Sequence, residues 1–303
     1  MTTVNPIVQE FKSTRQSVWR RTASLFAGVA SCALLSLAGM PPVQAQPVPL
    51  TAAADVGLVP FFMRTPSGTI DGFSNDMMAE VAKRLGRSKA EIIDTPFSAI
   101  FAGLFSSRYD MIAAPTNITK ERAAQMLFTE PYMAGGISFL VKKGNKIEKL
   151  EDLKGKLIGV NNGSFSDKWL QQNQEKYGYE IQRFNKNADA VQAVVIGRAY
   201  ANLSETPQAR WIAKQTPMLE AAYHHKTGSN YGLVFRKTDV ELRNQVEQII
   251  ECMKTDGTLA KLHEEWFGVP PDEGTSMAVV FPGFGAPGFD GHDPTEHKLV
   301  CKK

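Results

Sequence analysis

The sequence predicts an α/β protein with two lobes, each built on a mostly parallel sheet that helices flank. Short apolar segments with strand character alternate with segments whose apolar residues recur at helical spacing, and this alternation is typical of parallel β-α units. It begins after residue 50, is interrupted by a charged segment at residues 142–156, and then restarts. The chain after residue 45 is long enough for two modest hydrophobic cores.

The first lobe is predicted to comprise residues 46–141 together with residues 229–268. Its clearest helix begins at Ser74, because Met77, Val81 and Leu85 recur at helical spacing before a suitable stop at Gly86. The other predicted helices of this lobe cover residues 98–106, 239–253 and 258–266. Its predicted strands cover residues 55–59, 92–94, 109–114, 137–142 and 231–236.

The second lobe is predicted at residues 142–228, where the same plan repeats. The predicted strands cover residues 156–160, 180–184 and 201–203, and the predicted helices cover residues 166–177 and 188–197. We assign the neighbouring pair His224 and His225 to a loop. Residues 269–303 are rich in Pro and Gly with isolated aromatic residues, so an irregular C-terminal tail is expected.

Residues 1–45 have the pattern of a secretory signal peptide. Three arginines (Arg15, Arg20 and Arg21) precede an uncharged segment at residues 22–40, and a small residue, Ala45, offers a cleavage position. We therefore expect an exported, soluble protein, with a membrane-anchored, uncleaved form as the alternative.

Charge and cysteine content narrow the class of partner. The whole chain carries a net charge of +3, and removal of residues 1–45 would leave it close to neutral, with no basic stripe for nucleic acid. We expect no nucleic-acid partner. Outside the leader the cysteines are Cys252 and Cys301, which in an oxidising compartment either pair and fasten the tail to a late helix or remain free thiols.

A candidate binding site follows the predicted strand at residues 109–114. The loop after this strand ends at Thr119, a residue suited to cap a helix that starts at Lys120. Arg122 lies one turn into that helix, where its guanidinium could clamp a carboxylate. Ligands of α/β sheets bind at the carboxyl ends of strands. The alternative for this short stretch is an ordinary helix start with a solvated arginine.

Several motifs in order resemble the periplasmic solute-binding proteins of polar amino acid ABC importers, family 3, over Asp55 to Gly268. The motifs are Asp55 with Pro60-Phe61, Gly72 to Met77, Phe97 with Arg108-Tyr109-Asp110, Ile118 to Arg122, Phe128 to Tyr132, Gly159-Val160 with Gly163-Ser164, Asp256-Gly257-Thr258, and Trp266-Phe267-Gly268.

The resemblance implies a two-lobed periplasmic binding protein fold of the type II kind, with a hinge that closes on a ligand. It also implies a periplasmic, monomeric receptor that is not an enzyme, carries no cofactor or metal, and delivers an amino acid or related carboxylate to an ABC permease.

The resemblance also implies roles for individual residues. Arg122 would grip the ligand carboxylate, Phe97 would stack on the ligand side chain, and Asp55 could contact the polar end of that side chain. The remaining implied ligand contacts are Asn117, Thr119, Ala114, Asn161, Gly163, Ser164 and Glu205. The alternatives are structural: Phe97 as core, Asp55 as a strand-end cap, and Ser164 as an ordinary N-cap.

Four positions depart from the family pattern, and these departures bear on which ligand is bound. Glu205 stands where the family has an aspartate for the ligand ammonium, and Tyr200 replaces another acid. Pro115 removes one backbone donor, and Phe165 replaces a threonine. An amine-bearing ligand remains compatible with Glu205, but the identity of the solute stays open.

Two other functional classes are compatible with the sequence. This fold also includes cyclohexadienyl dehydratases, and a buried Glu205 could act as the general acid of such an enzyme. An accessory periplasmic protein could use the fold to bind a protein partner instead of a solute. The acids and histidines of the tail match no closed metal site.

Overall fold

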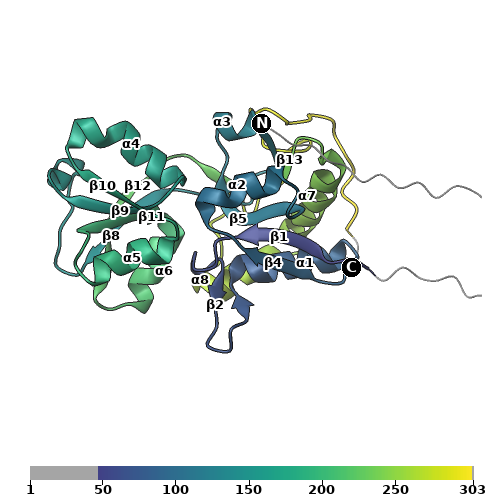
Figure 1. Ribbon diagram of the computed structural model, residues 1–303. Helices are drawn as coiled ribbons and strands as arrows, with labels where there is room; N and C mark the ends of the chain where they lie inside the picture. Colours follow the sequence, from purple (N-terminus) through teal and green to yellow (C-terminus); the bar gives the residue numbers. More distant parts are fainter. Residues whose placement is uncertain (1–46, 302–303) are drawn as a thin grey trace, which may run out of the picture. The chain divides into compact units, whose positions relative to one another are not determined.

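The structure is a computed structural model that describes residues 47–301. The predicted signal peptide at residues 1–45 lies outside the described residues. In the described part the strands form two main sheets and one short hairpin, and helices flank both sheets (Figure 1). None of the helices in this part has the length and apolar character needed to cross a bilayer.

The first sheet has the strand order β4-β1-β5-β13-β6, and β7 also pairs with β13. Strand β1 is parallel to β4 and β5, whereas β13 runs antiparallel to β5, β6 and β7. A separate hairpin consists of β2 (Met63–Arg64) and β3 (Ile70–Asp71). The strands of the first sheet are β1 (Leu50–Ala54), β4 (Ala90–Asp94), β5 (Met111–Asn117), β6 (Met126–Phe128), β7 (Met133–Ala134) and β13 (Asn230–Arg236).

The second sheet has the strand order β10-β9-β11-β8-β12. Strand β9 is parallel to β10 and β11, and β8 is antiparallel to β11 and β12. The strands are β8 (Ile137–Lys142), β9 (Leu157–Asn161), β10 (Glu180–Phe184), β11 (Ala201–Glu205) and β12 (Leu219–His225).

The helices bury their apolar residues against these sheets. In α1, for example, Met77, Met78 and Val81 are fully buried, and two basic residues close the last turn, where they suit the helix dipole. The first sheet packs with α1 (Phe73–Arg84), α2 (Phe97–Phe105), α3 (Lys120–Ala123), α7 (Val240–Thr255) and, through α1, α8 (Thr258–Phe267). The second packs with α4 (Phe165–Tyr177), α5 (Asn187–Val195) and α6 (Thr206–Gln215), and the 3-10 helix η1 (Leu150–Leu153) packs on α4.

The predicted two-lobed α/β fold is confirmed, with two differences in the sheets. Both are mixed rather than mostly parallel, because the strands that return from a crossing between the lobes, β8 and β13, run antiparallel to their neighbours. Strand β8 pairs in the second sheet, so the first crossing lies at residues 135–136 instead of the predicted 141/142 boundary. Gly136 has φ 153°, a backbone conformation that glycine tolerates best.

Two local predictions were wrong. The strand predicted at residues 55–59 is a turn, because β1 ends at Ala54, opposite the last residue of β4, and Gly57 takes φ 123°. Helix α6 and strand β12 were missed, so His224 and His225 lie on a strand rather than in a loop. Pro207 signals the start of α6, since proline is tolerated in the first helical turn.

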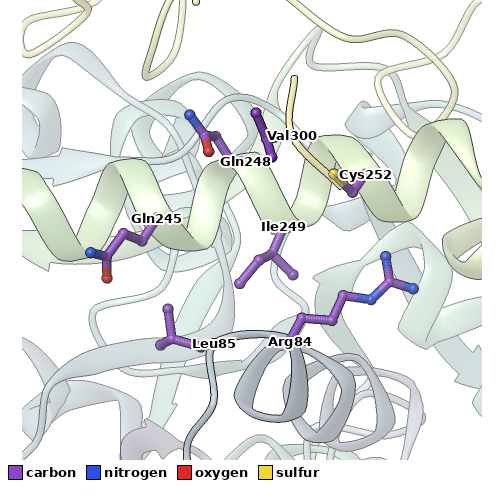
Figure 2. Close-up of a pocket in the computed structure, with 7 residues that line it drawn as sticks. All are labelled: Arg84, Leu85, Gln245, Gln248, Ile249, Cys252 and Val300. Atoms are coloured by element: carbon purple, nitrogen blue, oxygen red, sulfur yellow. The ribbon is translucent and has the colours of Figure 1, made fainter. Parts of the chain in front are cut away.

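The C-terminal tail contains no helix or strand in its described part but is attached to α7. Glu247 accepts a hydrogen bond from the Gly285 N–H (2.6 Å), and Glu251 contacts His297 Nε2 (2.8 Å). A disulfide joins Cys252 of α7 to Cys301 of the tail. Figure 2 shows the sulfur of Cys252 where the tail passes over this helix. Of the two outcomes that the sequence left open for Cys252 and Cys301, the disulfide that fastens the tail to a late helix is therefore confirmed. The sequence does not signal the contacts of Glu247 and Glu251, because these acids are far from the tail in the chain.

A buried ion pair lies under the tail. The Lys254 Nζ is 2.5 Å from Glu130 Oε1, and both side chains are inaccessible to solvent. Lys254 also donates to the carbonyls of Pro131 (2.7 Å) and Val279 (2.8 Å), and Glu130 accepts from the Phe281 N–H (2.7 Å). This pair therefore joins the first sheet, α7 and the tail.

We predict that Lys254→Met lowers the free energy of unfolding by about 3 kcal/mol, because Glu130 would be left buried without its cation. Urea denaturation would measure the loss. The double variant Glu130→Gln/Lys254→Met should recover about half of it, since no unpaired charge remains. The exposed Lys261 provides the control, and Lys261→Met should change stability by less than about 0.5 kcal/mol. Equal effects of Lys254→Met and Lys261→Met would contradict this account.

Candidate functional site

A small cavity lies between the two sheets, at the carboxyl ends of three strands. Asn117 ends β5, Asn161 ends β9 and Glu205 ends β11, and all three line the cavity, whose volume is about 30 Å³. The carboxyl ends of strands are the usual ligand-binding edge of α/β sheets. The full lining is Leu58, Phe97, Pro115, Asn117, Arg122, Asn161, Ser164, Phe165, Ser166, Asn187, Leu203, Ser204, Glu205 and Gln208.

Arg122 is placed by the local structure that the sequence predicts. The Thr119 hydroxyl caps α3 by accepting the N–H of Arg122 (3.2 Å). The Arg122 guanidinium lies over the rings of Phe97 (5.6 Å) and Phe101 (5.3 Å) and donates to the Asn117 carbonyl (3.0 Å). Burial lowers the pKa of Arg122 to about 10, so the side chain remains a cation at neutral pH. It can still offer donors to an anion.

Glu205 lines the same cavity as Arg122 and bridges the two sheets. One carboxylate oxygen accepts from Asn117 Nδ2 (2.9 Å), and the other accepts from the Tyr231 hydroxyl (2.8 Å). Burial raises the pKa of Glu205 to about 7, although the two hydrogen bonds and Arg122 oppose this rise. The charged form of this carboxylate is poorly solvated, so a cationic group placed beside it would stabilise that form.

Asp55 forms a second bridge between the sheets. It follows β1 directly and accepts a hydrogen bond from Asn161 Nδ2 (3.0 Å), with Lys186 Nζ 3.9 Å away. Burial raises the pKa of Asp55 to about 6 against the influence of Lys186 and Asn161. Lys186 itself pairs with Asp94 (2.6 Å) at the edge of the first lobe.

Four of the predicted contacts have structural roles. Thr119 is the helix cap, and the Ala114 carbonyl accepts a hydrogen bond from the Thr116 hydroxyl. The Gly163 N–H donates to Asp167 Oδ2 (3.0 Å), so this donor is already used, while the Gly163 carbonyl faces Arg122 (3.4 Å). Ser164 caps α4 and also lines the cavity. These residues position the site.

The structure adds four polar cavity residues that we did not predict from the sequence, namely Ser166, Asn187, Ser204 and Gln208. Six polar residues of the lining have buried side-chain atoms without a hydrogen-bond partner: Asn117 Oδ1, Asn161 Oδ1, Ser166 Oγ, Asn187 Nδ2, Ser204 Oγ, and both Nε2 and Oε1 of Gln208. Buried polar groups normally have partners, so this concentration indicates a place where a polar ligand supplies them. Gln208 could have been suspected, because it lies one helical turn after Glu205.

Another cavity, between α1 and α7, has no such cluster of unpartnered polar groups in its lining. It has a volume of about 200 Å³, and Figure 2 shows Arg84 and Leu85 on one side of it facing Ile249 on the other. Arg84 already pairs with Glu80 (2.7 Å) and Asp256 (2.6 Å). The charged group of this cavity is therefore already satisfied.

The described residues contain one acidic cluster with metal-ligand spacing. It consists of Glu130, Glu247 and Glu251, all buried. Lys254 bonds to Glu130, Arg243 Nε lies 4.0 Å from Glu247, and His297 contacts Glu251. Protein groups already contact all three side chains: Lys254 contacts Glu130, His297 contacts Glu251, and the Gly285 N–H of the tail donates to Glu247. We therefore assign the cluster to attachment of the tail.

The sequence of the chain matches those of known proteins. The profile of the family described as bacterial extracellular solute-binding proteins, family 3, matches residues 50–269. The L-cystine-binding protein TcyJ of Escherichia coli K12 is 32% identical over 212 residues, which cover 69% of this chain and 79% of that protein.

Solved structures show the same relationship. An ancestral arginine-binding protein bound to arginine has a TM-score of 0.69 and 34% identity, covering 73% of this chain and 98% of that one. An ancestral amino acid-binding protein described as a precursor of cyclohexadienyl dehydratase has a TM-score of 0.66 and 34% identity, covering 72% and 95%. The chain therefore belongs to family 3 of the bacterial extracellular solute-binding proteins.

Proposed function

We propose that this protein binds an amino acid or a related small carboxylate between its lobes and presents it to an ABC permease from the periplasm. The observation that carries the proposal is Arg122, a cation packed against two aromatic rings in a cavity that Glu205 of the other lobe also lines. A zwitterion carries complementary charges at both ends. The names of relatives, which include cystine-binding and arginine-binding proteins, support the same ligand class.

The ligand would enter by separation of the lobes. A cavity of about 30 Å³ accommodates one or two water molecules and is too small for an amino acid. Direct bonds hold the lobes together here, chiefly Asn117 to Glu205 (2.9 Å) and Asn161 to Asp55 (3.0 Å). We infer that opening breaks these bonds and that the ligand replaces them on closure, which is the hinge mechanism of two-lobed receptors.

We propose a role for Glu205 in binding the ligand ammonium. Its carboxylate is buried and its pKa is raised, which shows that the negative charge is destabilised by burial. A cation bound beside it would offset this destabilisation. The unpartnered amides and hydroxyls of Asn187, Ser166 and Gln208 lie on the same lobe and suit the polar side chain of the ligand.

We further propose that the protein is a receptor and not an enzyme. A buried carboxyl with a pKa near 7 resembles a general acid, and one solved relative is a precursor of a dehydratase. Both oxygens of Glu205, however, accept hydrogen bonds, from Asn117 and Tyr231, which stabilise the carboxylate form. Conversion of prephenate or arogenate by the purified protein would overturn this assignment.

We predict that Arg122→Ala abolishes most ligand binding. A screen of amino acids, opines and small carboxylates by thermal shift would first identify the ligand, and calorimetry would give its affinity. Loss of a two-pronged, charge-assisted contact with a carboxylate should cost about 3 kcal/mol, on the order of a hundredfold in Kd.

Arg108→Ala is the matched control, because Arg108 is an exposed arginine of the same lobe. It should bind the ligand as the unsubstituted protein does. Unchanged affinity in Arg122→Ala would refute the carboxylate clamp, and a folded, ligand-free protein that responds to no compound would favour the accessory-protein class.

We predict opposite effects of Glu205→Gln on stability and on binding. Because the pKa of Glu205 is raised from 4.5 to about 7, the unliganded protein should lose up to about 3 kcal/mol of stability as pH rises through this interval. Glutamine does not titrate, so urea denaturation should show the variant gaining stability relative to the unsubstituted protein between about pH 4 and pH 8.

The same variant should bind the ligand roughly tenfold or more weakly at neutral pH, since the ammonium loses its counter-charge. The exposed Glu180 of the same lobe supplies the control, and Glu180→Gln should change neither property. Full ligand affinity in Glu205→Gln would show that this carboxylate does not pair with the ligand.

A further inference from the structure

A second, larger cavity lies beside the crossings between the lobes. It has a volume of about 700 Å³, within the range of small-molecule sites. One wall is α6 of the second lobe, and another consists of the end of α8 and the first residues of the tail, including Pro270 and Asp272. The family profile ends at residue 269. The tail side of this cavity is therefore built largely from residues beyond the part of the chain that defines the family.

Helix α6 separates this cavity from the site between the lobes. Glu205 and Gln208, at the start of the helix, face the smaller cavity, whereas Arg210, Trp211 and Lys214 line the larger one. Arg210 and Lys214 are four residues apart and therefore share one helical face. The two cavities have different linings and can be tested separately.

The larger cavity has an excess of positive charge. Arg210, Lys214 and Lys226 line it, and Asp272 is the one acidic residue of the lining. Within the described residues none of these three cations lies within 4.0 Å of a carboxylate, although other exposed cations of the chain, such as Lys89 and Lys168, do form such pairs. Lys214 extends across the cavity towards Gly268, at the end of α8.

One of the three histidines of the lining, His224, is consistent with a positive field. His224 lines the cavity, and its Nδ1 contacts the Ser138 hydroxyl (2.6 Å). Burial lowers the pKa of His224, and the neighbouring Arg210 lowers it further. The positive charge of Arg210 is thus close enough to disfavour protonation of His224.

The cavity also offers apolar and aromatic surface. Trp211 projects from α6, and Phe267 and Pro270 lie on the opposite side. An inorganic anion would leave this surface uncovered, whereas a flat organic body would contact it while its charged groups reach the cations. We propose that this cavity is a binding site for an organic anion with two or more negative charges and a flat apolar body.

Benzene-1,3,5-tricarboxylate is a suitable probe, because it combines three carboxylates with one ring. Calorimetry at low ionic strength should show one molecule bound per chain. Citrate, which lacks the ring, and benzoate, which has one charge, should each bind at least about tenfold more weakly. Citrate that binds as tightly as the tricarboxylate would overturn the aromatic part of the proposal.

The double variant Arg210→Gln/Lys214→Gln should weaken binding of the tricarboxylate at least about tenfold. Both residues are exposed, so the thermal stability without the probe should be unchanged. The matched control is Lys143→Gln/Lys146→Gln, which removes two exposed cations from the same lobe and should bind normally.

Arg122→Ala separates the two sites, because it removes the carboxylate clamp between the lobes and leaves the larger cavity intact. It should bind the tricarboxylate as the unsubstituted protein does. Absence of binding, equal loss in the control pair, or loss in Arg122→Ala would each overturn the proposal, the last by placing the anion between the lobes. None of these outcomes depends on the ligand proposed for the smaller cavity.

Discussion

The carboxylate of Glu205 is buried where the two lobes meet, and it accepts hydrogen bonds from Asn117 and Tyr231 of the other lobe. Burial works against its charge, as its raised pKa indicates, so the carboxylate needs partners. In the closed arrangement the protein supplies them itself. A ligand ammonium would be a better partner because it carries the opposite charge. Replacement of the protein's own hydrogen bonds by this ion pair would link closure of the lobes to the proposed binding.

Arg122 completes the pair of opposite charges. Its position depends on the short helix α3, which the Thr119 hydroxyl caps, and on the rings of Phe97 and Phe101, which pack edge to face with each other and against the guanidinium. The aromatic neighbours hold the planar group in place and limit its hydration, so a carboxylate would meet a preorganised donor. Under the proposed function, Arg122 and Glu205 would bind the two charged groups of a zwitterion, and the amides and hydroxyls of the lining would contact its side chain.

The tail gives this chain features beyond the matched family region. Buried contacts of Glu130, Glu247 and Glu251, together with the disulfide, hold it on α7. Its first residues in turn form one side of the larger, basic cavity beside the crossings. Attachment of the tail to α7 therefore also shapes the larger cavity. Helix α6 contributes residues to the lining of both the larger and the smaller cavity.

The sequence alone determined most of the helices and strands and the order of the two lobes, because local periodicity and capping residues depend on neighbouring positions. It also singled out Arg122, through the family motif that contains it, as the candidate carboxylate clamp. It did not reveal α6, the pairing of β8 in the second sheet, or the inward direction of Ser166, Asn187 and Gln208. Those features depend on contacts between residues far apart in the chain. Only the tertiary structure places Asn117 beside Glu205, 88 residues away, and turns two strand ends into one site.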